Sequence, residues 1–361
     1  MKRKLKIKSV LIAVAILILL IVSIMVGFYY YNLTPVDKKS NEWQDVVISS
    51  GISRKDIAKL LKDKKLIRSD KVFMIYIKLN NANSLKAGTY KLKKSYSLGE
   101  IVKLLQKGSN YNPDEVKITF QEGINMRRIA KVIEQKTNNS YNDVFLKLED
   151  KEYIKSLIKK YWFLSDRILD KNIYYPLEGF LFPDTYIFKN KDVKVEEIFT
   201  AMLDNMDKVL TKYKDDIKKS NRDVFDIITM ASIAELEGNN DARKGITSVF
   251  YNRLKVNMNL GSDVTTYYAC KIEMNERDLY AKEFNTYNPY NTRGPKMEGK
   301  LPVGPVSIPS VGSIEAALYP LDTDYLYFVA DKNGKVFYSK TYQEHEKKIK
   351  EIKAKGDWIE W

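Results

Sequence analysis

The chain has almost no cysteine or histidine: its 361 residues include one of each, Cys270 and His345. A single cysteine excludes an intramolecular disulfide and a multi-cysteine zinc or iron–sulfur site. A Ser-His-Asp arrangement or a histidine-built metal site would have to use His345, which we interpret as a structural residue early in a C-terminal helix. We therefore expect acid–base chemistry to depend on carboxylates, with no metal and no cofactor.

Acidic residues are outnumbered by basic ones, and the formal net charge is +15. Residues 1–9 are strongly basic, and residues 10–31 then form a 22-residue stretch without any charge. At about 1.5 Å per residue this stretch spans roughly 33 Å, enough to cross a bilayer. The basic flank predicts a cytoplasmic N-terminus and an extracytoplasmic remainder. A cleaved signal peptide is the alternative, but the stretch is long and no small-residue cleavage site follows it.

The predicted extracytoplasmic location determines which partners we expect the basic surface to bind. We expect no nucleic acid partner for an exported domain, and we expect the cell membrane and anionic wall polymers to fit the positive charge better. The simpler interpretation is a lysine-rich solvated surface.

We predict an α+β protein, with an N-terminal transmembrane helix, LysM-like βααβ modules and a mixed α+β catalytic domain. The module prediction rests on a strand–glycine–helix beginning at 46–61 that is repeated in degenerate form at 116–133. Any strand–glycine–helix turn would look similar, which is the alternative. The expected segments are a cytoplasmic tail (1–9), a transmembrane helix (10–31), a linker (32–45), a LysM-like module (46–108), a second, truncated LysM-like segment (109–150), a helical connecting region (151–222), a catalytic domain (223–345), and a C-terminal helix and tail (346–361).

The segment 224–238, VFDIITMASIAELEG, predicts a helix that is apolar nearly all round and therefore buried, ending at Gly238. Glu235 and Glu237 fall in its last turn, where burial and the negative helix end favour a protonated carboxyl group, able to act as a general acid. Ala231 and Ser232 are small and leave room for a ligand below Glu235. Two positions apart on a helix is about 200° of rotation, so the two glutamates cannot form the facing carboxylate pair of a retaining glycosidase. The alternative is that both are solvated.

Loops rich in Pro, Gly and Asn at 287–293 and 301–310 are expected to line a cleft, although ordinary turns are the alternative. The segment 178–186 predicts an ordered turn with buried aromatic side chains. Near the C-terminus, strands at 325–330 and 335–339 flank an Asn-Gly turn, which is typical of a hairpin. Thr341 and Glu344 then form a capping-box pattern that opens a final helix.

Taken together, the chain resembles the YceG-like endolytic murein transglycosylase (MltG) family. The resemblance covers nearly everything from the membrane anchor to the final helix, and the motifs that carry it occur in the family's order. They are EGFLFPDTY (178–186), ASIAELE (231–237), SVFYNRL (248–254), GSDVTTYYA (261–269), YNPYNT (287–292), LPVGPVSIP (301–309) and DTDYLYFVADKNG (322–334).

The resemblance implies a single-pass enzyme that cleaves the β-1,4 bond between N-acetylmuramic acid and N-acetylglucosamine inside nascent glycan strands and leaves 1,6-anhydromuramic ends. The family's catalytic glutamate falls on Glu235. Peptidoglycan glycan strands are the implied substrate, and penicillin-binding peptidoglycan synthases are candidate partners. Alongside Glu235 we predict six substrate-binding side chains: Glu178, Asn252, Ser262, Asp263, Tyr290 and Asn291.

The sequence departs from the family pattern at several loop positions, including Val264, Val303, Arg293 and Ser310. We expect none of these to touch Glu235. One alternative function is a hydrolytic muramidase in which Glu178 or Asp263 activates water. The other is a non-catalytic wall-binding scaffold, whose LysM-like modules and basic surface hold a peptidoglycan synthase in place. For Ser262 and Asp263 themselves, the alternative to substrate binding is that one of them caps the helix that follows.

Overall fold

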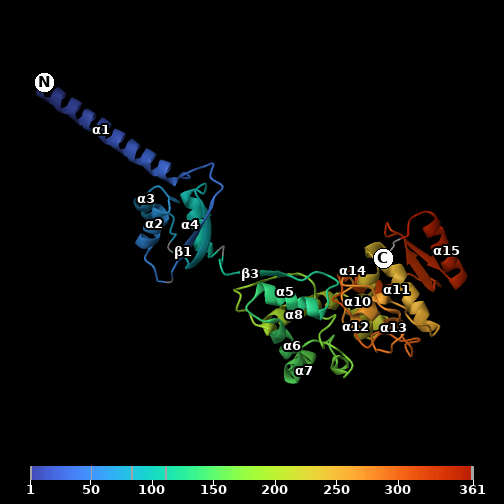
Figure 1. The fold of residues 1–361 in the computed structure, drawn as a ribbon. Helices are drawn as coiled ribbons and strands as arrows, with labels where there is room; N and C mark the ends of the chain where they lie inside the picture. Colours follow the sequence, from blue (N-terminus) through green and yellow to red (C-terminus); the bar gives the residue numbers. More distant parts are fainter. Residues whose placement is uncertain (1, 50, 83, 110–111, 359–361) are drawn as a thin grey trace. The chain divides into compact units, whose positions relative to one another are not determined.

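The computed structural model describes residues 2–49, 51–82, 84–109 and 112–358 (Figure 1). It confirms a mixed α+β protein with an N-terminal apolar helix. Contacts divide the chain into two compact units, Met1–Asp114 and Glu115–Trp361. The ends of both predicted tails, at Met1 and 359–361, and Ser50 at the end of the predicted first strand lie outside the described residues.

The first element, α1 (Lys2–Leu33), is one continuous helix that extends past both ends of the predicted span. Within it, residues 7–33 are long and apolar enough to cross a membrane. From Ile7 to Val26 the leucine, isoleucine and valine side chains are exposed, so this part of the helix lacks a protein partner among the described residues. Such a surface is unfavourable in water and favourable in lipid. The end of the helix differs, because Leu33 packs against the core of the first unit.

The rest of the first unit is a two-stranded antiparallel sheet covered by helices. Val46 lies opposite Tyr90 across the sheet, and both are fully buried in the unit's core. Ser53, Ser69 and Ser97 accept backbone hydrogen bonds as N-caps, as helix-start chemistry predicts. The elements follow the predicted βααβ order and a further helix: β1 (Trp43–Ile48), α2 (Arg54–Asp63), α3 (Asp70–Leu79), β2 (Gly88–Lys93) and α4 (Leu98–Lys107).

The second unit contains the remaining elements. They are β3 (Val116–Thr119), α5 (Met126–Lys136), α6 (Tyr141–Glu149), α7 (Lys151–Lys160), the 3₁₀ helix η1 (Asp166–Leu169), β4 (Thr185–Phe188), α8 (Val195–Thr211), α9 (Lys214–Lys219), α10 (Val224–Glu237), α11 (Asn240–Lys255), α12 (Asp263–Cys270), α13 (Ala281–Phe284), α14 (Val311–Leu318), β5 (Tyr327–Ala330), β6 (Val336–Ser339) and α15 (Tyr342–Ala354).

The predicted second module does not form a compact unit of its own. Its strand β3 pairs antiparallel with β4, with Thr119 opposite Thr185. Its helices α5 and α6 contribute Ile129, Ile133 and Val144 to the core of the second unit. The segment 115–150 therefore folds together with the predicted connecting region, which itself contributes the strand β4 rather than helices alone. A local strand–glycine–helix pattern carries no information about which strand becomes its partner.

Helix α10 is the centre of the second unit. Every residue from Ile227 to Ala234 is fully buried, as its apolar composition predicts. The helix packs against α11, α12 and α14. Because α10 is fixed on several sides, the side chains in its last turn are fixed as well.

The C-terminal hairpin and helix follow the prediction closely. β5 and β6 pair antiparallel, and Thr341 caps α15 with Glu344 completing the capping box. The ring of His345 stacks on Tyr327, with ring centroids 5.3 Å apart. The helix begins at Tyr342, directly after its predicted cap, so the expected segment boundary at 345/346 falls inside α15.

Candidate active site

The end of α10 places its two glutamates in different cavities. Glu235 lines a cavity of about 350 Å³, and Glu237 lines a neighbouring cavity of about 580 Å³. The cavities share a partition of four side chains: Leu236, Val264, Tyr267 and Met274. The prediction that the two carboxyl groups point to opposite sides of the helix is thus confirmed.

The Glu235 side chain is held on both carboxyl oxygens and is only 5% exposed. Arg243 Nη2 donates to Oε1 at 2.7 Å. Oε2 accepts from the Ser310 backbone N–H at 2.8 Å, from Ser310 Oγ at 2.6 Å and from Ser313 Oγ at 2.7 Å. Burial and the end of the helix are therefore not the only influences on this carboxyl group, because a buried arginine and three further donors also act on it.

The donors come from helix starts. Ser310 is the N-cap of α14, so Glu235 lies at the positive end of that helix. Arg243 lies in the first turns of α11, where its Nε also donates to the Gly238 carbonyl at 2.9 Å. The expectation that no departure from the family pattern touches Glu235 is wrong, because Ser310 is one of those departures.

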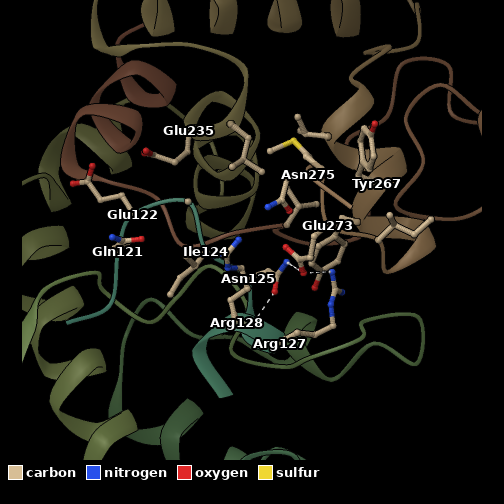
Figure 2. A pocket seen from close by; sticks show the side chains of 17 residues that line it. Gln121, Glu122, Ile124, Asn125, Arg127, Arg128, Glu235, Tyr267, Glu273 and Asn275 are labelled. Carbon is tan, nitrogen blue, oxygen red and sulfur yellow. Dashed lines mark hydrogen bonds and ion pairs between the residues drawn. The ribbon is translucent and has the colours of Figure 1, made fainter. Parts of the chain in front are cut away.

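A loop between β3 and α5 forms another wall of the Glu235 cavity (Figure 2). Gly123 N–H donates to Ile308 O and Ile308 N–H donates to Ile124 O, both at 2.9 Å. This pairing brings Glu122 into the cavity beside Glu235. Sequence reasoning missed Glu122, Arg243 and Ser313; the only local signal was a glutamate directly before a glycine in a strand–helix turn.

Two of the predicted substrate-binding residues lie on the Glu237 side. Ser262 Oγ donates to Glu237 Oε1 at 2.5 Å, and Ser262 is 2% exposed. Asp263 lines the second cavity and forms an ion pair with Arg293. Ser262 is the N-cap residue of α12 but makes no side-chain capping bond. The Ser262 hydroxyl therefore binds Glu237 and does not cap α12.

Glu178 lies outside both cavities. It is 1% exposed, and its carboxylate accepts from the Met126 backbone N–H at 3.0 and 3.1 Å and from Tyr268 Oη at 2.9 Å. It thus joins the start of α5 to α12. Burial raises the pKa of Glu178 to about 7, against the lowering effect of these hydrogen bonds.

Tyr290, Asn291 and Asn252 are likewise bonded to the protein itself and line neither cavity. Tyr290 is fully buried and its hydroxyl accepts from Tyr174 N–H. Asn291 Nδ2 donates to three backbone carbonyl groups of 283–286, and Asn252 Nδ2 donates to two of 323–325. The three side chains therefore hold neighbouring backbone segments in place through these hydrogen bonds.

Buried carboxyl groups make the stability of the second unit depend on pH. Burial raises the pKa of Glu237 to about 7 from its ordinary 4.5. The folded state then binds a proton that the unfolded state has released, so the free energy of unfolding falls as the pH rises from 4.5 to 7. We expect Glu237→Gln to remove this loss, gaining about 3 kcal/mol on the parent chain between pH 5 and pH 8. Urea denaturation of the variant and the parent chain at both pH values measures this gain. If the free energies of unfolding of the two proteins differ by the same amount at both pH values, the assignment of the raised pKa to Glu237 is wrong.

Within the described part of the chain, no three His, Cys, Asp or Glu side chains come together in a way that could hold a metal ion. The chemistry that the site offers is proton transfer by a carboxyl group in a confined cavity. Its surroundings are hydroxyl, guanidinium and backbone N–H donors.

Comparison with known proteins fits this arrangement. Residues 46–351 match the YceG-like family. The chain belongs to the YceG-like family. A crystal structure of a YceG-like protein from Listeria monocytogenes has a TM-score of 0.61 and 40% sequence identity, covering 85% of this chain and 99% of that one.

Curated YceG-like relatives carry an activity in their names. A Bacillus subtilis protein named endolytic murein transglycosylase is 38% identical over 340 residues, which is 92% of each chain. A Streptococcus pneumoniae protein of the same name is 35% identical over 343 residues. This alignment includes 90% of the chain but only 61% of the Streptococcus protein's length.

Proposed function

We propose that this protein is a membrane-anchored endolytic murein transglycosylase, a lyase that cuts nascent peptidoglycan strands and so ends their elongation. The observation that carries the proposal is the placement of Glu235, a carboxyl group oriented by four donated hydrogen bonds inside a cavity. The relatives named endolytic murein transglycosylase share 35–38% sequence identity with this chain, and their names support the same reaction.

In the proposed reaction Glu235 first gives its proton to the oxygen that links muramic acid to the next glucosamine, and that glycosidic bond breaks. The 6-hydroxyl of the muramic residue then attacks its own anomeric carbon and returns its proton to Glu235. No water is consumed, and the product is a 1,6-anhydro end. The donors from Arg243, Ser310 and Ser313 stabilise the carboxylate that exists between the two proton transfers.

Water-dependent cleavage would require a second carboxylate facing the same bond. The two candidates named from the sequence do not meet this requirement. Glu178 is sealed by Met126 and Tyr268, and Asp263 faces the other cavity in an ion pair with Arg293. These positions remove both carboxylates named from the sequence, and Glu122 is a carboxyl group that shares the cavity with Glu235.

The product decides between the two reactions. We expect purified glycan strands digested by the full chain to end in anhydromuramic acid, which is lighter than the hydrolytic end by one water. Mass spectrometry of the released fragments measures this difference. Reducing muramic ends would instead establish hydrolysis, and no fragments at all would favour the wall-binding scaffold.

The remaining proposals concern location and partners. We propose that α1 anchors the chain in the cell membrane with its basic N-terminus in the cytoplasm and both units outside. The LysM-like module at 46–108 would bind the wall glycan, and penicillin-binding synthases would supply the nascent strand.

Within the cavities, we retain Asp263 as a proposed substrate contact, and we propose that the five other predicted residues position the loops around it.

A further inference from the structure

The C-terminal end of α1 is built into the first unit. Tyr29 and Leu33, in its last turns, pack against the core of that unit. The guanidinium of Arg68 lies over the ring of Tyr31, 4.7 Å from the ring centroid, and its Nη2 donates to Pro35 O at 2.7 Å. Apolar, cation–π and hydrogen-bonding contacts therefore fix the first unit directly to the end of the helix.

The length of α1 sets the depth at which these contacts lie. The charge-free stretch 10–31 spans roughly 33 Å, close to the thickness of the hydrocarbon core of a bilayer, about 30 Å. With this stretch across the membrane, Tyr29, Tyr30 and Tyr31 come to the outer interface, where tyrosine side chains are enriched. Because Tyr29 also packs against the first unit, that unit begins at the level of the lipid headgroups.

Helix α3 contacts α1 and presents a mixed face to its surroundings. Four exposed side chains of α3 fall within about 100° of its circumference: Lys71, Ile75, Lys78 and Leu79. Ile75 is 48% exposed and Leu79 is 68% exposed, while the opposite side of the helix is buried in the core of the unit. Neither lysine ammonium group has an ion-pair partner among the described residues.

The composition of this face fits a lipid surface. Exposed aliphatic side chains are unfavourable in water, and a lysine can lay its apolar stem along such a surface while its ammonium group reaches polar surroundings. Aliphatic side chains flanked by lysines are typical of a helix that lies in the plane of the bilayer interface. The ten residues of α3 span about 15 Å, so the whole face also stays close to the end of the membrane helix.

The charge of this face is not cancelled within its own helix. The acidic residue of α3 is Asp70, and its carboxylate is bound by Lys62 Nζ of α2 at 2.9 Å. Lys71 and Lys78 therefore keep their positive charge for a partner outside the protein. Anionic lipid headgroups attract such lysines when they lie close to the membrane surface.

We propose that the exposed face of α3 is a membrane-contact surface, with Ile75 and Leu79 at the acyl boundary and Lys71 and Lys78 on anionic headgroups of the outer leaflet. The proposal rests on the proposed insertion of α1 in the membrane. It gives the first unit two attachments to the bilayer, one through α1 and one through α3. The unit is then held in one orientation on the membrane surface and does not swing about the end of α1.

The test is the environment of residue 79 in the full chain, reconstituted into vesicles of phosphatidylglycerol and phosphatidylcholine. Leu79→Cys in a Cys270→Ser background carries an environment-sensitive fluorophore at this one position. We expect its emission to shift to shorter wavelength and to be lost when the acyl chains of the lipid carry spin-label quenchers. Val47→Cys in the same background is the matched control, because Val47 is an exposed aliphatic residue of the same unit on β1. Its label should neither shift nor be quenched.

Charge reversal tests the headgroup contact. Lys71→Glu combined with Lys78→Glu leaves both aliphatic side chains in place but repels anionic lipid, so the label at residue 79 should lose its shift and escape quenching. In vesicles of phosphatidylcholine alone, the shift in the parent background should be smaller. Quenching that survives the charge reversal unchanged would overturn the contact with anionic headgroups.

The outcome is separable from that of the proposed function. Flotation of the vesicles first reports whether α1 holds the chain in the membrane, and a chain that does not float overturns both the anchor and this contact. If the chain floats and the label at residue 79 stays in water, only the contact of α3 fails. The contact also fails if the labels at residues 47 and 79 respond equally. A label at residue 79 that responds to soluble glycan strands and not to lipid would assign the face to wall binding instead.

Discussion

Glu235→Gln is expected to lower strand cleavage by at least about 10⁴-fold, the upper end of what general acid–base catalysis contributes, because one residue serves both steps. The amide keeps the shape of the side chain, and its oxygen can still accept from Ser310 and Ser313. It can neither give up nor take back a proton at the required steps. Release of soluble fragments from purified glycan strands measures the effect.

Glu237→Gln is a matched control in the same helical turn. It removes an equivalent carboxyl group that faces the other cavity and should retain cleavage within a few-fold. If Glu235→Gln folds and still releases anhydro-ended fragments, the assignment of Glu235 is wrong. If Glu237→Gln is the inactive variant, the catalytic cavity has been misassigned.

The second large effect is on stability. Gly179→Ala is expected to destabilise the second unit by roughly 2–4 kcal/mol, from a strained backbone and overpacking together. Gly179 has φ +82°, and an added Cβ would lie 2.4 Å from Pro305 Cβ and 3.1 Å from Ile228 Cγ2. Proline is too rigid to move aside easily, and Ile228 is in the fully buried part of α10. Urea denaturation measures the loss.

Gly356→Ala separates strain from crowding. Gly356 has φ +68°, but nothing lies within 4 Å of its added Cβ. It should cost only about 1 kcal/mol, the backbone part of the effect. Equal losses for the two variants would show that the contact with Pro305 relaxes and that only the backbone conformation matters.

The sequence was sufficient where a pattern is local. The apolar run of α10, its end at Gly238 and the opposite orientation of Glu235 and Glu237 all follow from helical periodicity. The serine caps of α2, α3 and α4 and the C-terminal hairpin follow from short-range hydrogen bonding. These features need no knowledge of what packs against them.

The sequence was insufficient where segments far apart meet. Nothing in the α10 pattern indicates that Arg243 and Ser310 would bind Glu235, because periodicity identifies a buried face but not its partners. Tyr290 and Asn291 have the composition of cleft-lining residues, yet their polar atoms are needed to satisfy buried backbone groups. Glu122 was overlooked because its segment was assigned to a separate module.

The spacing of the Glu235 donors along the chain has a consequence for when the enzyme becomes active. Ser310 and Ser313 follow Glu235 by 75 and 78 residues. A polypeptide that has emerged from the ribosome only as far as α11 carries Glu235 and Arg243 without three of the four hydrogen-bond donors to the Glu235 carboxyl group. We therefore expect the surroundings of Glu235 to be complete only once α14 has been synthesised.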